Sequence, residues 1–119
     1  MRDFHKIDVW KRSHQLTIAI YKVTETYPRD EIFGLTSQIR RAVSSIPTNI
    51  AEGCGRNSDA ELFNFFNIAS GSAAEVEYQL VLSKDLGYLD ESAATELANE
   101  ITEIRKMLGS YMRKLKANN

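Results

Sequence analysis

The chain has 119 residues, of which 43% are hydrophobic, and a net charge of −1. This length fits one domain, residues 1–119, whose core needs no disulfide or metal. No segment reaches the roughly 20 apolar residues that cross a bilayer, and no apolar run of signal-peptide length follows the charged first residues. The single Cys54 cannot pair within the chain, which indicates a reducing compartment. We therefore expect a cytoplasmic protein with no membrane partner.

The first two helices are predicted from the spacing of apolar residues. One covers about residues 9–27, and Pro28 ends it because the residue before proline avoids the α region. The second runs from near Thr36 to residue 53 or 55, with Pro47 inside it. An interior proline removes a backbone hydrogen bond. We expect a kink there, with Ser44 or Ser45 helping to satisfy the freed carbonyl groups.

The last two helices are predicted over residues 58–87 and from Asp90 onward. Ser58 and Glu61 have the spacing of a capping box, in which each side chain bonds the other residue's backbone N–H. Gly71 and its small neighbours indicate close approach of another helix, because a mid-helix glycine costs about 1 kcal/mol relative to alanine. The fourth helix has the most regular heptad, and residues 116–119 are expected to fray.

Short connections make consecutive helices antiparallel neighbours. The fold class predicted from the sequence is therefore all-α, an antiparallel up-down-up-down four-helix bundle with a kinked second helix.

Residues for catalysis or cofactor binding are sparse, so we expect no enzyme, no cofactor and no metal. His5 and His14 are nine residues apart and do not share a helix face. Cys54 has no activating neighbour in the sequence and is expected to be inert. Gly53 and Gly55 lack the lysine that a phosphate-binding loop requires.

Two polar residues on the second helix have a structural and a functional interpretation. Asn49 falls on the same helix face as Ala42 and Gly53, so it is expected to point inward or into an interface. Asn49 and Glu52 could bond the backbone around Pro47 or a neighbouring helix, or could form a ligand or subunit contact. The structural interpretation is favoured, because a proline inside a helix leaves carbonyl groups to satisfy.

Part of the second helix closely resembles the signature of the 23S rRNA-intervening-sequence protein family. Residues 35–42 and 45–53 carry the resemblance, and the most specific element is Pro-x-Asn-Ile-Ala-Glu-Gly at residues 47–53. The residues of that element singled out as a structural motif are Pro47, Asn49, Glu52 and Gly53. Val9-Trp10, Tyr27-Pro28 and residues 69–72 and 86–89 extend the match over nearly the whole chain.

The resemblance implies a four-helix bundle that assembles into a ring-like homopentamer. The chain is also similar to the accessory protein of diversity-generating retroelements, which implies that it binds RNA or DNA and a nucleic-acid-processing protein. One feature departs from many relatives, which carry more basic residues after the turn that ends at Arg56. Here residues 57–61 include Asp59 and Glu61 instead.

The charges are distributed unevenly. Residues 58–104 hold one basic and ten acidic groups, whereas residues 105–119 hold five basic and no acidic groups. In an up-down-up-down bundle this pattern places basic groups at one end and acidic groups at the other. The predicted basic end contains Lys6, Lys11, Arg12, Arg56, Arg113, Lys114 and Lys116. The predicted acidic end contains Asp30, Glu31, Asp85, Asp90, Glu91 and Glu96.

Two explanations of this polarity remain open from the sequence. Charges of these signs complement the dipoles of the helices, which explains the fourth helix but not Lys6, Lys11 and Arg12. Alternatively, the basic residues bind phosphate groups of RNA or DNA, and a ring would repeat them around one rim. The sequence thus predicts a non-catalytic homo-oligomeric binding or scaffold protein; the alternative is a protein–protein adaptor.

Aromatic residues outside the main seams are candidates for the subunit interface: Trp10, Tyr21, Phe65 and Tyr78.

Overall fold

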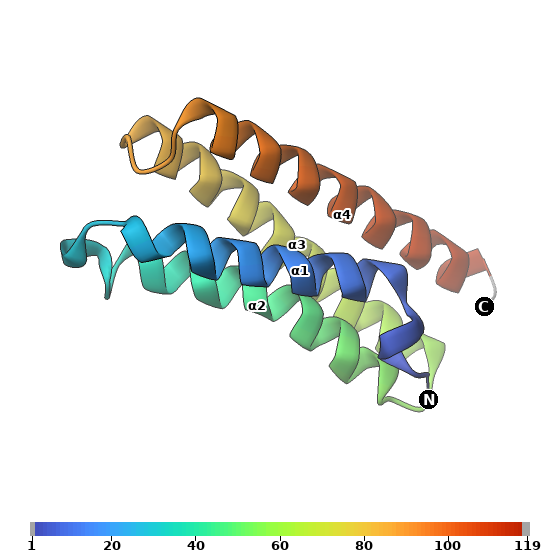
Figure 1. Ribbon diagram of the computed structural model, residues 1–119. Coiled ribbons are helices and arrows are strands. Elements are labelled where there is room, and N and C mark those ends of the chain that lie inside the picture. The colour runs from blue at the N-terminus through green and yellow to red at the C-terminus, as the bar shows by residue number, and fades with distance from the viewer. Residues whose placement is uncertain (1, 118–119) are drawn as a thin grey trace.

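The computed structural model describes residues 2–117, which form four helices and contain no strand. The helices lie side by side, and both ends of the chain lie at the same end of the bundle (Figure 1). Three short 3-10 turns complete the described segment, at Phe4–Lys6, Thr24–Thr26 and Arg29–Glu31. The four helices are α1 (Asp8–Val23), α2 (Leu35–Cys54), α3 (Asp59–Asp85) and α4 (Glu91–Ala117).

Consecutive helices pack against each other, as the short connections require. α1 packs on α2, α2 on α3 and α3 on α4, while the contact between α1 and α4 is sparser. The predicted all-α, up-down-up-down bundle is confirmed. All four helices contribute to one hydrophobic core, in which Ile20, Ile46, Phe66 and Leu108 are fully buried.

The first helix ends one turn earlier than predicted. α1 stops at Val23, and the 3-10 turn Thr24–Thr26 takes the place of its last turn. Arg40 of α2 explains this end: its Nε donates to Thr24 Oγ1 (2.9 Å) and its Nη2 to the Tyr21 carbonyl (3.1 Å). The last carbonyl groups of a helix have no partner within the helix. A side chain from α2 therefore caps α1, which local sequence could not reveal.

Pro47 lies within α2, and the helix continues through it. Because Pro47 has no N–H, the carbonyl group of Val43 loses its usual partner. The hydroxyl of Thr17 on α1 partly replaces that partner: its one proton is shared between the Ser13 carbonyl (2.8 Å) and the Val43 carbonyl (3.2 Å). The expectation that Ser44 or Ser45 would do so is wrong, since Ser44 donates to the Arg41 carbonyl instead. The kink at Pro47 stays a prediction.

The bond between the Thr17 hydroxyl and the Val43 carbonyl is expected to contribute to stability. Replacing Thr17 with valine leaves the Val43 carbonyl unsatisfied and is expected to lower the free energy of unfolding by about 1 kcal/mol. In a Pro47→Ala background the residue 47 N–H becomes available to that carbonyl, so Thr17→Val should cost less there. Urea unfolding of the four variants in a double-mutant cycle measures the coupling. Equal costs in the two backgrounds would contradict this role of Thr17.

The boundaries of α3 and α4 agree closely with the expected ones. Ser58 caps α3, accepting from the Glu61 N–H (3.2 Å), but the Glu61 carboxylate bonds the Ser58 hydroxyl rather than its backbone N–H. Only half of the predicted capping box is therefore present. Asp90 caps α4 through the Ala93 N–H (2.8 Å). Expected fraying is wrong for residues 116–117, which are helical, and residues 118–119 lie outside the described part.

Candidate functional site

The basic end is built where α1 and α3 begin and where α2 and α4 end (Figure 1). A groove of about 450 Å³ runs between the start of α1 and the end of α4. Lys6 and Lys114 line it together with Ser110 and Tyr111. Residues that are more than one hundred positions apart in sequence are thus brought to one concave surface, which offers two ammonium groups, a serine and a tyrosine, with the carboxylate of Asp8 also on its wall.

Four of the predicted cations are exposed and free of ion pairs among the described residues. Each of them can therefore meet an external anion without first breaking an internal contact. They come from the turn before α1 and from the last two turns of α4. The four are Lys6, Arg113, Lys114 and Lys116.

Other cations at this end are partly neutralised. Arg56 Nη2 lies 3.3 Å from Glu52 Oε1, and its guanidinium stacks over the ring of Phe65 at 4.8 Å. Lys11 lies 4.0 Å from Asp8. Arg2, which the sequence analysis did not single out, lies 3.0 Å from the Asp59 carboxylate. The fold thus places carboxylates between these cations, and a count of cations along the sequence does not reveal them.

Arg12, which the sequence assigned to the basic end, is ion-paired with a residue of α4. Its Nε and Nη2 donate to the two carboxylate oxygens of Glu100 on α4, at 2.8 and 2.9 Å. This two-point bond raises the pKa of Arg12, while partial burial opposes the rise. Arg12 therefore links α1 to α4, two helices that otherwise share few contacts. Its assignment to the basic end stays a prediction, but its charge is paired, and the sequence could not show that Glu100 faces it.

The polar residues of the Pro-x-Asn-Ile-Ala-Glu-Gly element do not converge on a ligand site. Asn49 is half-buried, and its Nδ2 donates to both the carbonyl and the hydroxyl of Ser45 (2.8 Å each). The Ser45 hydroxyl lies 2.9 Å from that of Ser72, which links α2 to α3. Glu52 is exposed and pairs with Arg56, rather than bonding the backbone around Pro47 or a neighbouring helix as the structural interpretation expected. The favoured structural interpretation of Asn49 holds.

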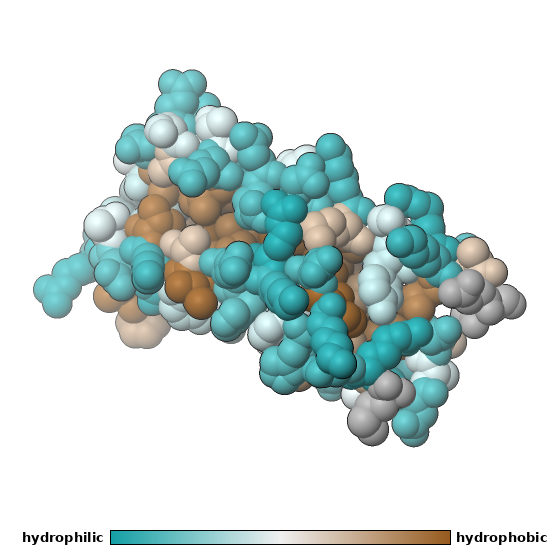
Figure 2. Space-filling model, turned by 45° about the vertical axis from the view of Figure 1, so that its right-hand side comes forward, coloured by the Kyte–Doolittle hydropathy of each residue, from teal (hydrophilic) through white to brown (hydrophobic). Residues whose placement is uncertain are grey.

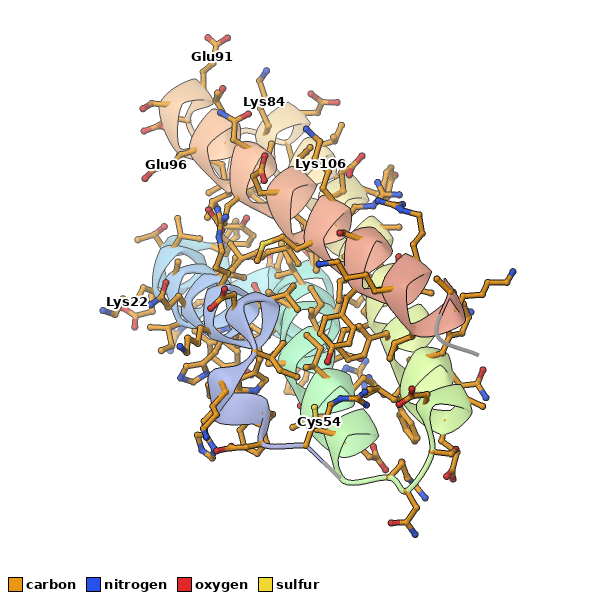
Figure 3. The ribbon with its side chains drawn as sticks, turned by 90° about the vertical axis from the view of Figure 1, so that its right-hand side faces the viewer. Lys22, Cys54, Lys84, Glu91, Glu96 and Lys106 are labelled. Atoms are coloured by element: carbon orange, nitrogen blue, oxygen red, sulfur yellow. The ribbon has the colours of Figure 1, made fainter. Side chains whose placement is uncertain are left out.

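The histidines and the cysteine are also placed away from any shared site. His5 bonds Asp3 (2.7 Å), and His14 stacks on Trp10 with ring centroids 5.1 Å apart. Cys54 is buried beside the N-terminal segment (Figure 3), where burial raises the pKa of its thiol. A raised pKa disfavours the reactive thiolate, in agreement with the inert role expected of Cys54. Among residues 2–117, no three metal-binding side chains form a cluster.

The opposite end of the bundle carries the acidic residues, but it also holds cations. Lys22, Lys84 and Glu91 point outward there (Figure 3). Glu31 is engaged internally: Oε1 accepts from the Leu35 N–H (3.1 Å) and Oε2 from the Tyr88 hydroxyl (2.8 Å). These bonds lower the pKa of Glu31, with the Leu35 bond contributing most. Glu31 therefore links the connection between α1 and α2 to the connection between α3 and α4.

The lowered pKa of Glu31 predicts how stability changes with pH. A carboxyl group whose pKa is lower in the folded than in the unfolded state stabilises the fold above its ordinary value, here 4.5, and loses that contribution as the pH falls through the folded value. Wild type is expected to exceed Glu31→Gln in stability at pH 7, and the difference should shrink below about pH 4.5. Chemical unfolding at several pH values measures it. A difference that stays constant down to pH 3 would contradict this account.

A family model for the 23S rRNA-intervening sequence protein matches residues 5–110. The chain belongs to this family. A crystal structure of a protein with unknown function from the S23 ribosomal protein family of Bacteroides thetaiotaomicron VPI-5482 is similar, with a TM-score of 0.81 and 30% identity. The similarity covers 88% of this chain and 95% of that one. No curated protein matches this chain.

The similarity to this structure covers the helical bundle of the intervening-sequence family chain. It indicates no activity, because the related structure is itself described as a protein of unknown function. The most specific sequence element of the family has a structural role here. Gly53 lets α2 and α3 approach closely, because a Cβ at this position would lie 2.9 Å from Phe65 Cβ. Within residues 2–117, no helix combines the length and apolarity that a bilayer crossing requires.

Proposed function

We propose that this chain is a non-catalytic, homo-oligomeric binding protein that associates with RNA or DNA through its basic end. The observation that carries the proposal is the groove where Lys6 and Lys114 face one space. Arg113 and Lys116 extend this charge along the last turns of α4. Phosphate groups attract such unpaired cations without regard to base sequence.

Self-assembly strengthens the proposal, because a ring repeats each cation around one rim. We propose a homopentamer on the strength of the family. Exposed aromatic residues support a subunit interface: Tyr21 and Tyr78 are 43% and 63% exposed. Trp10 and Phe65, which were also candidates, are half-buried within the protomer. The free thiol of Cys54 supports the cytoplasmic location that the sequence suggests.

Nucleic-acid binding is tested by charge reversal at the groove. Lys6→Glu combined with Lys114→Glu is expected to weaken binding of a fluorescent single-stranded RNA or a DNA duplex at least about tenfold, measured by anisotropy. The slope of log affinity against log salt should also become shallower, by about 0.7–0.9 per lost phosphate contact. The matched control is Lys22→Glu with Lys84→Glu, which reverses two exposed lysines at the other end.

The control should bind as wild type does, and both variants should keep the wild-type mass in solution. No binding by wild type at 50 mM salt would contradict the proposal. Equal weakening by the control would also contradict it, because the basic end would then have no special role.

A second candidate function is a protein–protein adaptor, and one observation favours it. Phe33 is 97% exposed in the connection between α1 and α2, and its neighbour Ile32 is 51% exposed. An aromatic side chain in water has an unfavourable free energy that binding would recover. Partners retained after nuclease treatment and lost with Phe33→Ser would favour the adaptor, whereas partners released by nuclease would favour the nucleic-acid function.

A further inference from the structure

α3 has apolar side chains on two opposite faces. Phe66 and Val76 on one face are fully buried in the core. On the other face, Ile68 is 51% exposed, Tyr78 63% and Leu86 49%. A helix that is apolar on both faces is normally covered on both. The outward row, with intervals of three or four residues, is here called the α3 stripe: Ile68, Gly71, Glu75, Tyr78, Leu82 and Leu86.

Gly71 lies in the middle of the α3 stripe. A Cβ built at this position meets no atom within 4 Å. The expectation that another helix of the same chain approaches Gly71 is therefore wrong. A glycine inside a helix costs about 1 kcal/mol relative to alanine, and nothing in the protomer offsets that cost. Close approach of a second molecule along the α3 stripe would use the missing side chain.

A second exposed apolar surface lies on the other side of the bundle. A groove of about 410 Å³ between α1 and α2 is lined by Trp10, His14 and Pro47, among others. Ile18 and Tyr21 extend this row along α1 and are 44% and 43% exposed. This surface, here called the α1–α2 face, is concave where the α3 stripe is a ridge. On the face drawn in Figure 2, hydrophobic surface likewise shows between the hydrophilic side chains.

The two surfaces carry opposite charges. Glu75 lies at the centre of the α3 stripe, and Asp85 lies near its end. The α1–α2 face is flanked by Lys11 and Arg41, which are both exposed. Arg41 makes no ion pair with any residue in the described part of its own chain. A carboxylate in an apolar ridge and an available guanidinium beside an apolar groove are complementary.

We propose that the α3 stripe of one copy docks into the α1–α2 face of the next copy, with Glu75 beside Arg41. The inference rests on the self-assembly proposed above and names the surfaces that carry it. Two different surfaces make a head-to-tail contact, which produces a closed ring when the rotation between copies closes. A two-fold contact between two α3 stripes would instead give a dimer and would place Glu75 residues of the two copies near each other.

Charged substitutions on the α3 stripe test the first surface. Ile68→Lys with Tyr78→Lys places two cations in the contact and is expected to weaken assembly at least about 100-fold, measured as mass against concentration by sedimentation. Ile32→Lys is the matched control, because Ile32 is as exposed as Ile68 but lies on neither surface. If wild type assembles and the double variant keeps its mass, this inference is wrong while the proposed self-assembly stands. A monomeric wild type would contradict both.

A cysteine pair tests the second surface. Glu75→Cys with Arg41→Cys in one chain is expected, after mild oxidation, to give a ladder of covalent oligomers on a non-reducing gel. Each single variant should stay monomeric on that gel, since buried Cys54 does not compete. Covalent dimers from Glu75→Cys alone would show a two-fold contact between α3 stripes and overturn the inference. Absence of any ladder from the pair in an assembled protein would overturn the Glu75–Arg41 register.

Discussion

Replacing Phe66 with alanine is expected to lower the free energy of unfolding by about 3–5 kcal/mol. Phe66 lies in the first third of α3 and is 0% exposed, and its ring centroid lies 4.6 Å from that of Tyr111 on α4. The substitution removes the transfer free energy of the ring and leaves a cavity that the packed helices can fill only in part. For a domain whose total stability is about 5–15 kcal/mol, this loss is large.

Urea unfolding followed by helical circular dichroism measures this effect, at one protein concentration because assembly would contribute to stability. Phe33→Ala is the matched control: the same atoms are removed from a side chain that is 97% exposed. We expect the control to change the free energy of unfolding by less than about 0.5 kcal/mol. A loss below 1 kcal/mol in Phe66→Ala would show that the core is packed differently.

Gly53→Ala is expected to lower the free energy of unfolding by about 1–3 kcal/mol, although alanine is the better helix former. The new Cβ would lie 2.9 Å from Phe65 Cβ and 3.0 Å from Leu62 Cδ1. The Leu62 methyl group can rotate away, but Phe65 Cβ moves only with the backbone of α3. The helices must therefore separate, which weakens their packing along the whole contact.

Gly55→Ala is the matched control for this prediction. A Cβ at residue 55 would contact only the carbonyl oxygen of Glu52 at 3.4 Å and that of Ala51 at 3.9 Å. Its φ of −80° is also ordinary for alanine. Thermal unfolding of both variants should show a clear loss for Gly53→Ala and little change for Gly55→Ala. If Gly53→Ala is as stable as wild type, the close contact between α2 and α3 is not needed.

The spacing of apolar residues predicted the bundle, because each helix has a row of apolar residues on the face that packs into the core. Ile20, Ile39 and Ile104 lie on those rows and are fully buried. Contacts between helices were not predictable in the same way. The bond from Thr17 to the Val43 carbonyl joins residues 26 positions apart, and the pair between Arg12 and Glu100 joins residues 88 positions apart. No local pattern in the sequence encodes either pairing.

The candidate interface was predicted in outline for a similar reason. Helix order alone places the start of α1 beside the end of α4, where Lys6 and Lys114 line one groove. Which cations stay unpaired depends on side-chain geometry: Arg56 meets Glu52, and Arg2 meets Asp59. The available charge is therefore smaller than a count of lysine and arginine suggests, and it is concentrated on the last turns of α4 and the turn before α1.

Self-assembly is the claim on which the proposed ring of cations and the pairing of the α3 stripe with the α1–α2 face both depend. Sedimentation of the full chain at micromolar concentration, after nuclease treatment, tests it most directly. The account predicts a mass five times that of the 13.5 kDa protomer, independent of bound nucleic acid. A single species of 13.5 kDa would contradict it.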